Sequence, residues 1–466
     1  MTEATDRRPG RIDVVDSLRG FAVVGIILIH FLEHLNFYSF PELTAFDRGL
    51  WDTVFYLGAS KMYAIFALLF GFSCFVQHDN RNRYGVDFRP RFAWRMFLLF
   101  LWGILDLVFF NGDILCTYAV LGLLLIPLVK APDRLLILVA ILLFVQPIEL
   151  VYLIIGLADP SSRPMDLSIG HYWADAYRAC AQGGFIDVAM ANLSGGLQIN
   201  FGWAIEHGRL TQTLFLFVVG MLAGRHKLFS DDASSLRFWR KALCAAVMMF
   251  VPLQLLLLAL PFESMSPCVS QSLDILLTAW RNFSMMTFYT GSIILLYYTT
   301  AARNAISHLA CIGKMSLTAY LLQSIAGGFL FYNWGLSLHQ YCGHTLSFLL
   351  GILFCICLYL FCRQWTRIFR RGPLEEIWSR ATNISLAYTY TALLTLFHYC
   401  QGGKQYHSNL TNHPYAAPTQ KIKNNRITCL LTDNLDVGKL YNLCLYEFWN
   451  NIFLFRVNLL PLHPNS

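Results

Sequence analysis

The sequence predicts an all-α, polytopic membrane protein with about ten transmembrane helices. Hydrophobic residues make up 56% of the 466 residues and charged residues only 14%, whereas a soluble protein carries about 25% charged residues. The mean hydropathy is +0.49, and the apolar residues come in long blocks separated by short polar stretches. This composition excludes a soluble enzyme, a disordered chain, a coiled coil and a disulfide scaffold.

Ten segments qualify as membrane spans, since a span needs about 20 mostly apolar residues. Their approximate limits are 19–38, 53–77, 92–110, 113–129, 134–157, 204–226, 241–261, 279–300, 314–334 and 344–363. The polar gap at 110–113 is so short that the third and fourth spans must form a tight hairpin in the membrane.

The basic residues predict the orientation of these spans. If the N-terminus and every second loop are cytoplasmic, the cytoplasmic segments hold 21 Lys and Arg residues and the opposite segments hold six. The six are Arg48, Lys61, Arg163, Arg178, Arg209 and Arg281. Because cytoplasmic loops of membrane proteins are enriched in Lys and Arg, both ends of the membrane domain are predicted to lie in the cytoplasm.

The chain is predicted to have four parts. A basic N-terminus (1–18) precedes the transmembrane domain (19–363), and a cytoplasmic segment with the sequence Gly-Pro-Leu-Glu (364–380) follows it. The loop at 158–203 is the longest one predicted outside, and it forms either a short helix on the membrane face or a plain connection. The tail at 381–466 differs in composition from the rest and has no spanning segment, so no function is assigned to it.

Several kinds of chemistry have no support in the sequence. The net charge of +7 comes from short basic clusters between apolar blocks, which indicate topology and not nucleic-acid binding. The 13 Cys are scattered without a CxxC or metal-type spacing, so no metal site is predicted. The chain also lacks the P-loop, GxGxxG, GxSxG and HExxH motifs of nucleotide, hydrolase and zinc-peptidase chemistry.

The first span carries the densest set of ionisable residues. An ionisable group at bilayer depth costs about 2.5–3.5 kcal/mol on insertion scales, so each is a candidate for function. At 100° per residue, Arg19 and His30 point within about 20° of each other, and His30 lies about 16 Å further along the helix. The same stripe is expected to carry the remaining members of the set, Asp16, Glu33 and His34.

This stripe suits a transfer across the membrane. With the N-terminus inside, Arg19 can bind an anionic carrier near the cytoplasmic surface through bidentate hydrogen bonds. His30 then lies past the bilayer midplane and can take a proton from an acceptor, with Glu33 or Asp113 behind it. The alternative is that Arg19 extends to the lipid headgroups and that His30 only bonds a neighbouring helix.

Other polar residues in the spans are candidates for the same cavity. The predicted substrate-binding set consists of Arg19, Asp16, His34, Lys61, Asp106, Tyr118 and Glu149, and the predicted catalytic set consists of His30, Glu33 and Asp113. Gln146 and Pro147 break the fifth span next to Glu149, and such a break usually lines a cavity.

These residues lie in stretches that resemble a known family. The run RIDVVDSLRGFAVVGIIL resembles the start of the YeiB-like bacterial membrane proteins, which contain the domain of unknown function 418. The stretches SKMYAIFALLFGFS, GDILCTYAVLGLLLIP, IGKMSLTAYLLQS and RRGPLEEIW agree in the same order, so the resemblance covers about residues 11–380. The stretch beyond about residue 380 has no counterpart in the family.

The YeiB-like family is similar to a wider group of transmembrane acyltransferases, whose O-acyltransferase members carry an Arg, ten residues and a His in the first span. Arg19 and His30 match that spacing, although many YeiB-like members have Asn at the second position. The resemblance implies that acyl-CoA is the co-substrate, that no cofactor is bound and that a carbohydrate or lipid-linked molecule is the acceptor. It also implies a location in the bacterial cytoplasmic membrane.

Two functions therefore remain open from the sequence. The first is transfer of an acyl group from acyl-CoA to a hydroxyl or amine. The second is transport or export of a small or lipid-linked substrate, because charges inside the membrane also line substrate and proton pathways. No inverted repeat is evident across the ten predicted spans, which weakens the transport hypothesis without excluding it.

Overall fold

The computed structural model describes residues 12–383, and within this range every regular element is a helix. The helices in chain order are α1 (Asp13–Leu32), α2 (Ala45–Gly58), α3 (Met62–Asn82), α4 (Arg89–Leu107), α5 (Leu115–Leu123), α6 (Leu125–Leu128), α7 (Asp133–Phe144), α8 (Pro147–Ala158), α9 (Gly170–Gln182), α10 (Phe185–Glu206), α11 (Arg209–Arg225), α12 (Ala233–Ala259), α13 (Pro267–Thr299), α14 (Arg303–Ser307), α15 (Ala310–Lys314), α16 (Ser316–Phe331), α17 (His344–Ile368) and α18 (Pro373–Asn383). Two short 3-10 turns lie at Phe262–Ser264 and Leu338–Gln340. The tail at 384–466 lies outside the described residues.

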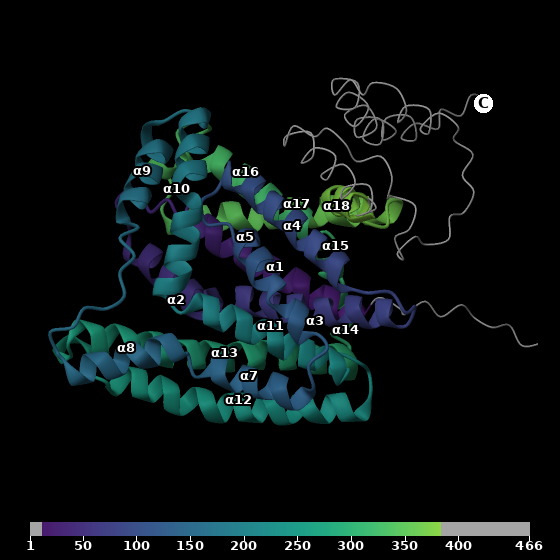
Figure 1. Cartoon of the computed structure of the whole chain (residues 1–466). Coiled ribbons are helices and arrows are strands. Elements are labelled where there is room, and N and C mark those ends of the chain that lie inside the picture. Colours follow the sequence, from purple (N-terminus) through teal and green to yellow (C-terminus); the bar gives the residue numbers. More distant parts are fainter. Residues whose placement is uncertain (1–11, 384–466) are drawn as a thin grey trace, which may run out of the picture. The chain divides into compact units, whose positions relative to one another are not determined.

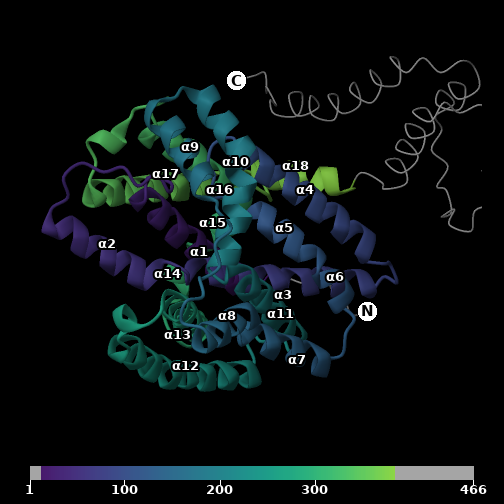
Figure 2. The same cartoon turned by 60° about the vertical axis from the view of Figure 1, so that its left-hand side comes forward.

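The helices pack around α1 and α3. Helix α1 contacts α3, α15, α16 and α17, while α3 packs along α11. Helices α7, α8, α12 and α13 lie together along one edge, as Figures 1 and 2 show. Helix α1 is the most enclosed of the candidate spans, because 61% of its apolar window is buried against only 6% for α12. Helix α12 therefore presents most of its apolar surface to the surroundings.

The contact between α1 and α15 depends on two glycines. A Cβ at Gly20 would lie 2.0 Å from the carbonyl oxygen of Leu309, and a Cβ at Gly313 would lie 1.8 Å from that of Asp16. No side chain fits at these distances, so the two helices approach through bare backbone, as small residues allow in membrane proteins. The contact brings Arg19, which precedes Gly20, and Lys314, which follows Gly313, to the same region of the fold.

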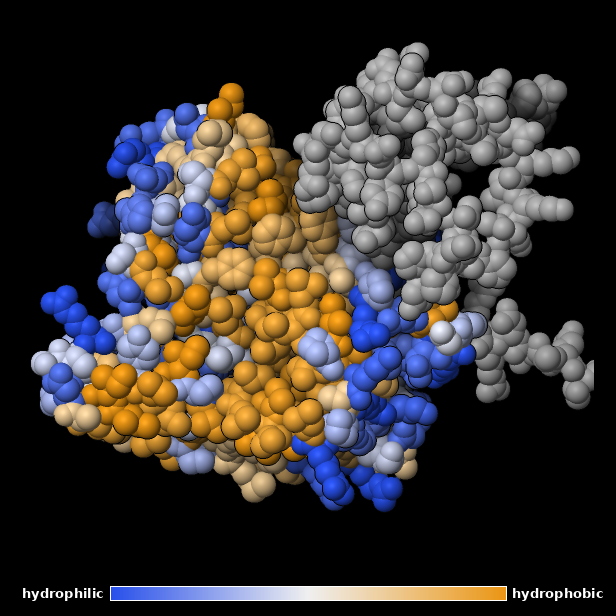
Figure 3. All heavy atoms as spheres, viewed as in Figure 1, coloured by the Kyte–Doolittle hydropathy of each residue, from blue (hydrophilic) through white to orange (hydrophobic). Residues whose placement is uncertain are grey.

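The described residues contain the helices of a multi-pass membrane protein. Four helical runs are long and apolar enough to cross a membrane, namely α1, the run from α2 to α3, α12 and α17. Two further pairs qualify if each bent pair is one span: α7 with α8, bent by 40°, and α14–α15 with α16, bent by 74°. Figure 3 shows hydrophobic side chains gathered across the middle of the visible face and hydrophilic ones at its two ends.

The ten predicted apolar segments all fall in helices, but several boundaries differ from the prediction. The first span was predicted at 19–38, whereas α1 ends at Leu32 because His34, Leu35 and Asn36 all have positive φ. The second segment is divided between α2 and α3 at residues 59–61. The predicted break in the fifth span is confirmed: Gln146, with φ of 55°, separates α7 from α8.

The long predicted loop at 158–203 is largely helical. It contains α9 and most of α10, which pack against each other. The expectation of a plain connection is therefore wrong. The alternative was a short helix, and the structure has two helices here, α9 and the longer α10. Glu206 ends α10, and Gly208, with φ of 64°, turns the chain into α11.

Contacts between loops divide the fold into two ends. At the end that we call the basic end, Arg225 bonds Asp133 at 2.6 Å, Lys314 lies 3.6 Å from Asp13, and Tyr298 donates to the carbonyl of Phe229. At the opposite end, Asp47 accepts from Thr345 and Glu206 accepts from Leu167. Segments predicted on one side of the membrane thus contact segments predicted on the same side.

Candidate functional site

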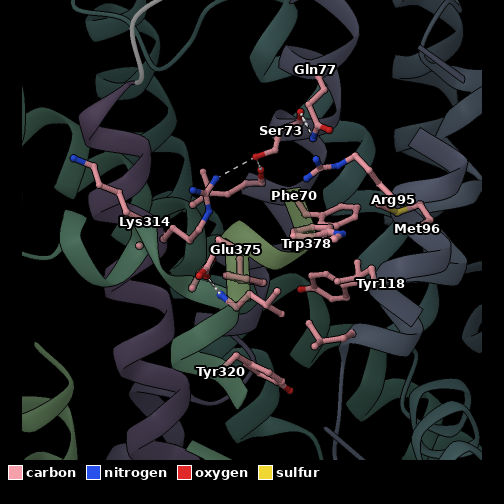
Figure 4. A pocket seen from close by; sticks show the side chains of 18 of the residues that line it. Phe70, Ser73, Gln77, Arg95, Met96, Tyr118, Lys314, Tyr320, Glu375 and Trp378 are labelled. Carbon is pink, nitrogen blue, oxygen red and sulfur yellow. Dashed lines mark hydrogen bonds between the residues drawn. The ribbon is translucent and has the colours of Figure 1, made fainter. Parts of the chain in front are cut away.

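A cavity of about 400 Å³ lies between α1, α3, α4, α5, α15, α16 and α18. Its walls are mainly aromatic and aliphatic, and polar side chains gather toward the basic end. Figure 4 shows it from close by, with Gln77 and Ser73 at one end and Tyr320 at the other. The lining residues are Arg19, Phe66, Leu69, Phe70, Ser73, Gln77, Phe92, Arg95, Met96, Leu99, Leu115, Tyr118, Gly313, Lys314, Ser316, Leu317, Tyr320, Glu375 and Trp378.

Three cationic side chains line the part of the cavity that faces the basic end. Arg19 donates to Asp16 Oδ1 at 2.9 Å and to Ser73 Oγ at 3.1 Å. The guanidinium of Arg95 lies 4.4 Å from the ring centre of Trp378, and its buried Nε has no hydrogen-bond partner among residues 12–383. Lys314 is the third cation, and it lies 3.6 Å from Asp13. Two of the three cations thus have a carboxylate partner, and all three bring N–H donors that suit an anionic ligand.

The carboxylate of Glu375 also lines the cavity, and its oxygens are occupied by donors of α16. It accepts hydrogen bonds from the backbone N–H groups of Leu317 and Thr318, at 2.8 and 3.0 Å, and from the Thr318 hydroxyl at 2.6 Å. These donors lie in the first turn of α16, where a carboxylate is stabilised by the helix dipole. The Gly-Pro-Leu-Glu segment therefore caps α16 and holds α18 against the cavity.

Helix α18 also carries ion pairs of its own, outside the predicted spans. Arg380 donates to Glu376 at 2.9 Å and Arg371 donates to the same carboxylate at 3.2 Å. The hydrogen bond from Arg380 and that from Arg371 lower the pKa of Glu376. This exposed network is local: it joins α18 to the turn before it and supports the helix that carries Trp378.

Two tyrosines form the deep part of the cavity. The hydroxyl of Tyr118 donates to the carbonyl of Tyr63 at 3.1 Å, and that of Tyr320 accepts from the N–H of Ile114 at 3.2 Å. One turn beyond Tyr320, Ser324 donates to Asp106 Oδ2 at 3.1 Å. The deep end of the cavity is therefore separated from a buried carboxylate by a single turn of α16.

Asp106 and Asp113 form a buried acidic pair behind this turn. Both side chains have no exposed surface, and they are close enough to interact electrostatically. Asp113 accepts from the N–H groups of Leu115 and Cys116, at 3.0 and 2.9 Å, and so caps α5. The Oδ1 atom of Asp106 has no partner among the described residues. Neither carboxylate lines the cavity.

His30 lies on α1 beyond the cavity. Its ring packs against Phe110 with 5.1 Å between ring centres. The side chain of Gln323 is a close neighbour of the same ring. His30 Nδ1 and both polar atoms of the Gln323 amide are buried without a hydrogen-bond partner within residues 12–383. Arg19 and His30 thus share one helix, but only Arg19 lines the cavity.

The predicted stripe does not continue past the end of α1. Glu33 is the C-cap of the helix and accepts from the hydroxyl of Tyr38 at 2.9 Å. His34 contacts Ser347 Oγ through Nε2 at 2.6 Å and stacks on Phe331 with 4.3 Å between ring centres. The N–H of Glu33 still bonds the carbonyl of Ile29, so the helical geometry lasts to Glu33. It ends at His34, because His34, Leu35 and Asn36 have positive φ and turn the chain away from the helix axis.

Two other predicted residues lie away from the cavity. Lys61 donates to the backbone carbonyl of Tyr56 at 2.6 Å and belongs to a separate basic cluster. Glu149 is buried in α8, where its Oε1 has no partner among the described residues. Of the predicted set, Arg19 and Tyr118 line the cavity, and Asp16 holds Arg19.

The sequence argument did not select several residues that line the cavity. Arg95 and Lys314 were counted only as topology signals, and Trp378 lies in a stretch noted only for its resemblance to a family. Tyr320 was not considered because a single Tyr in an apolar segment has no distinctive pattern. Within residues 12–383 no group of three or more His, Cys, Asp or Glu side chains is arranged to hold a metal ion.

Comparisons with known proteins match both halves of the described chain. Residues 223–385 match the family model described as "Protein of unknown function (DUF418)". Residues 11–159, which include α1 and the acidic pair, match the model described as "Heparan-alpha-glucosaminide N-acetyltransferase, catalytic".

Individual relatives match along most of their length. The "Uncharacterized protein YxaH" of Bacillus subtilis is 24% identical over 402 residues, which is 80% of this chain and 95% of the relative. The "Uncharacterized protein YeiB" of Escherichia coli is 28% identical over 392 residues, or 79% and 95% of the two chains. The chain is therefore similar to the YeiB-like DUF418 proteins along most of its length, and its N-terminal part links it to the wider group of transmembrane acyltransferases.

Proposed function

We propose that this protein is a membrane-embedded acyltransferase that takes an acyl group from acyl-CoA and passes it to a hydroxyl or amine of a glycan or lipid-linked acceptor. The observation that carries this proposal is the cavity, which combines a cationic part at the basic end with an apolar interior. The match of residues 11–159 to an acetyltransferase catalytic model supports the same class of reaction.

The cavity suits the donor in both of its chemical parts. Acyl-CoA carries phosphates, which Arg19, Arg95 and Lys314 can bind by charge-assisted hydrogen bonds. Its acyl end is apolar and can lie among Phe70, Leu99 and their neighbours, which line the interior. In this arrangement the thioester reaches toward Tyr118 and Tyr320, near the acidic pair.

The proposed reaction is a direct transfer assisted by His30. The oxygen or nitrogen of the acceptor attacks the thioester carbonyl. A neutral His30 accepts the proton that this hydroxyl or amine loses. The new bond to carbon forms, the carbon–sulfur bond breaks, and the proton passes to the leaving thiolate of CoA. Within this scheme the Gln323 amide, which lies by His30, orients the ring or the acceptor.

This mechanism requires a defined topology. We propose ten spans in the bacterial cytoplasmic membrane with both ends of the membrane domain in the cytoplasm, so that the basic end faces the acyl-CoA pool. The bias of 21 basic residues against six supports this orientation. The contacts that join loops of the same predicted side also support it.

A pair of substitutions on one helix tests the cavity. Leu99 lines the cavity and Leu101, two residues on, is 47% exposed. We expect Leu99→Trp to fill the cavity and reduce transfer of labelled acyl groups from acyl-CoA into glycan or lipid fractions by about tenfold or more, because volume is tightly constrained in packed sites. Leu101→Trp should leave transfer unchanged.

Two results would contradict the proposal. The first is a wild-type protein, purified and reconstituted, that never labels an acceptor or releases CoA. The second is movement of a substrate across vesicles with no acyl donor present, which would favour the transport function instead.

A further inference from the structure

Three cations form a second basic cluster that is separate from the cavity. Lys61 is the N-cap of α3, Arg209 is the first residue of α11, and Arg281 lies in α13. Lys61 is only 2% exposed and lies within electrostatic range of both arginines. We call these three residues the outer basic cluster.

The outer basic cluster has no carboxylate partner within the described residues. No Asp or Glu between residues 12 and 383 forms an ion pair with any of the three side chains. The acid that affects Arg281 is Asp274, which is exposed two turns away on the same helix and is bonded to Thr278. Like charges brought together without counter-charge repel each other, so the cluster is poised to bind an anion.

The neutral contacts of the cluster leave donors unused. Arg209 donates to the hydroxyl of Tyr63 at 3.2 Å and to Gln212 Oε1 at 3.1 Å. Arg209 also donates to the hydroxyl of Ser60. Among the described residues, Arg281 has one contact of this kind, with Gln254 Oε1 at 3.5 Å. The Nε atoms of both arginines are buried with no partner in the part of the chain that the structure describes. Buried donors without acceptors are costly, and an anionic ligand would satisfy them.

The depth of the cluster indicates what kind of anion it meets. Arg209 lies about 24 Å along α11 from Arg225, Arg281 about 27 Å along α13 from Thr299, and Lys61 about 32 Å along α3 from Asn82. These distances start at the basic end and match the thickness of a hydrocarbon core, about 30 Å. The outer basic cluster therefore lies near the opposite boundary of the membrane, at the level of lipid headgroups.

The surroundings of the cluster also suit a lipid. The rings of Tyr56, Tyr63 and Trp203 lie within 5.1–5.6 Å of its guanidinium groups, and such rings are enriched at membrane interfaces. Gln254, which contacts Arg281, belongs to α12, and exposed Leu255 and Leu258 follow it on that helix. Acyl or isoprenoid chains can lie along this apolar surface while a headgroup occupies the cluster.

We propose that Lys61, Arg209 and Arg281 bind the phosphate group of a lipid at the membrane face opposite the basic end. The phosphate belongs either to a membrane phospholipid or to a lipid-linked acceptor, and both present the same charged oxygens. Arginine binds phosphate through paired N–H groups, which fits the unused Nε donors. This site does not depend on acyl transfer, although it would place a lipid-linked acceptor on the side where the proposed reaction needs it.

The test measures lipid binding to the detergent-purified full chain by native mass spectrometry, without acyl-CoA. The probes are phosphatidylglycerol, a polyprenyl phosphate, phosphatidylcholine and inorganic phosphate. We expect the anionic lipids to bind, and the double variant Arg209→Gln/Arg281→Gln to weaken that binding by about tenfold or more, because charge-assisted hydrogen bonds are lost. Arg178→Gln is the matched control, since Arg178 is exposed and pairs with Asp175.

The outcomes separate the sources of the phosphate. Preference for the polyprenyl phosphate supports a lipid-linked acceptor, and equal binding of phosphatidylglycerol supports a general headgroup site. Equal binding by the wild type and the double variant, or binding of inorganic phosphate alone, overturns the proposal. If the double variant does not fold, Arg281→Lys keeps the charge and should retain part of the binding, whereas unchanged binding counts against the site. Because no acyl donor is present, these results do not depend on the transfer reaction.

Discussion

At the scale of single residues, His30 is the sharpest test of the proposed chemistry. We expect His30→Ala to reduce acyl transfer by about 10²–10⁴-fold, the usual value of general-base assistance, while the protein still accumulates in membranes. Transfer of labelled acyl groups and the amount of membrane-inserted protein are the two measurements. His30 Nδ1 has no partner to lose within the described residues, so any loss of stability should come mainly from the packing of the ring against Phe110.

His34 provides the contrast for this prediction. Its ring is fully buried and bonded to Ser347, and it stacks on Phe331. His34→Ala should lower the thermal stability of the purified protein, because it removes a buried contact and leaves the Ser347 hydroxyl unpaired. Near-normal transfer in His30→Ala would show that His30 is a packing residue.

Arg19 should act on donor binding. We expect Arg19→Ala to raise KM for acyl-CoA more than it lowers kcat, since a guanidinium that holds phosphates binds ground state and transition state alike. Arg19→Lys should recover part of the affinity, because Lys keeps the charge and loses the paired N–H groups. Arg89→Ala is the control: Arg89 is exposed, pairs with Asp87 and is not among the cavity residues. A fall in kcat alone would argue against a donor-binding role.

The residues of the site were only partly predictable from sequence. The spacing correctly placed Arg19 and His30 on one helix, because helical periodicity is regular between caps. The same periodicity does not extend past Glu33, since nothing in the local sequence predicts the three successive positive φ values that begin at His34. Arg95 and Lys314 could be placed in the cavity only by tertiary packing, which joins α4, α15 and α18 around it.

At the scale of elements, the crossing of α1 and α15 depends on the absence of a side chain. We expect Gly313→Ala to destabilise the protein by about 1–3 kcal/mol or more, because its Cβ would overlap backbone atoms that cannot move aside alone. Gly49→Ala is the matched control, since a Cβ there meets nothing within 4 Å. It should be neutral or stabilising by about 0.5–1 kcal/mol, as Ala is the better helix former. Thermal unfolding of the detergent-purified variants measures both effects, and equal unfolding temperatures would contradict the close crossing.

Sequence patterns predicted the elements better than their limits. Long apolar runs predicted helices correctly because a membrane segment must satisfy its backbone hydrogen bonds internally. The helices α9 and α10 were less evident, since their polar and aromatic composition lacks an apolar run of spanning length. The cap that Glu375 gives to α16 joins residues more than 50 positions apart, and no local pattern reveals such a contact.

At the scale of the whole molecule, the cavity can receive acyl-CoA in only one orientation of the protein in the membrane. The basic end carries Arg19, Arg95 and Lys314, so the proposed function requires this end to face the compartment where acyl-CoA is present. The outer basic cluster must then lie at the opposite face. A measurement of the membrane orientation therefore tests the donor site and the lipid site together. Its result does not bear on the fold.

Reporter fusions at four exposed positions can measure this orientation. We expect fusions after Tyr84 and Asp231 to behave as cytoplasmic, because both residues lie in loops at the basic end. Fusions after Ser161 and Glu263 should behave as periplasmic, because these residues follow α8 and α12 at the other end of the fold. Alkaline phosphatase should be active only at the second pair and a green fluorescent protein only at the first. If two or more sites report the inverse, the cavity opens away from the acyl-CoA pool. The donor proposal would then fail even if His30→Ala abolished a measurable activity, since that activity would have to draw on a different substrate.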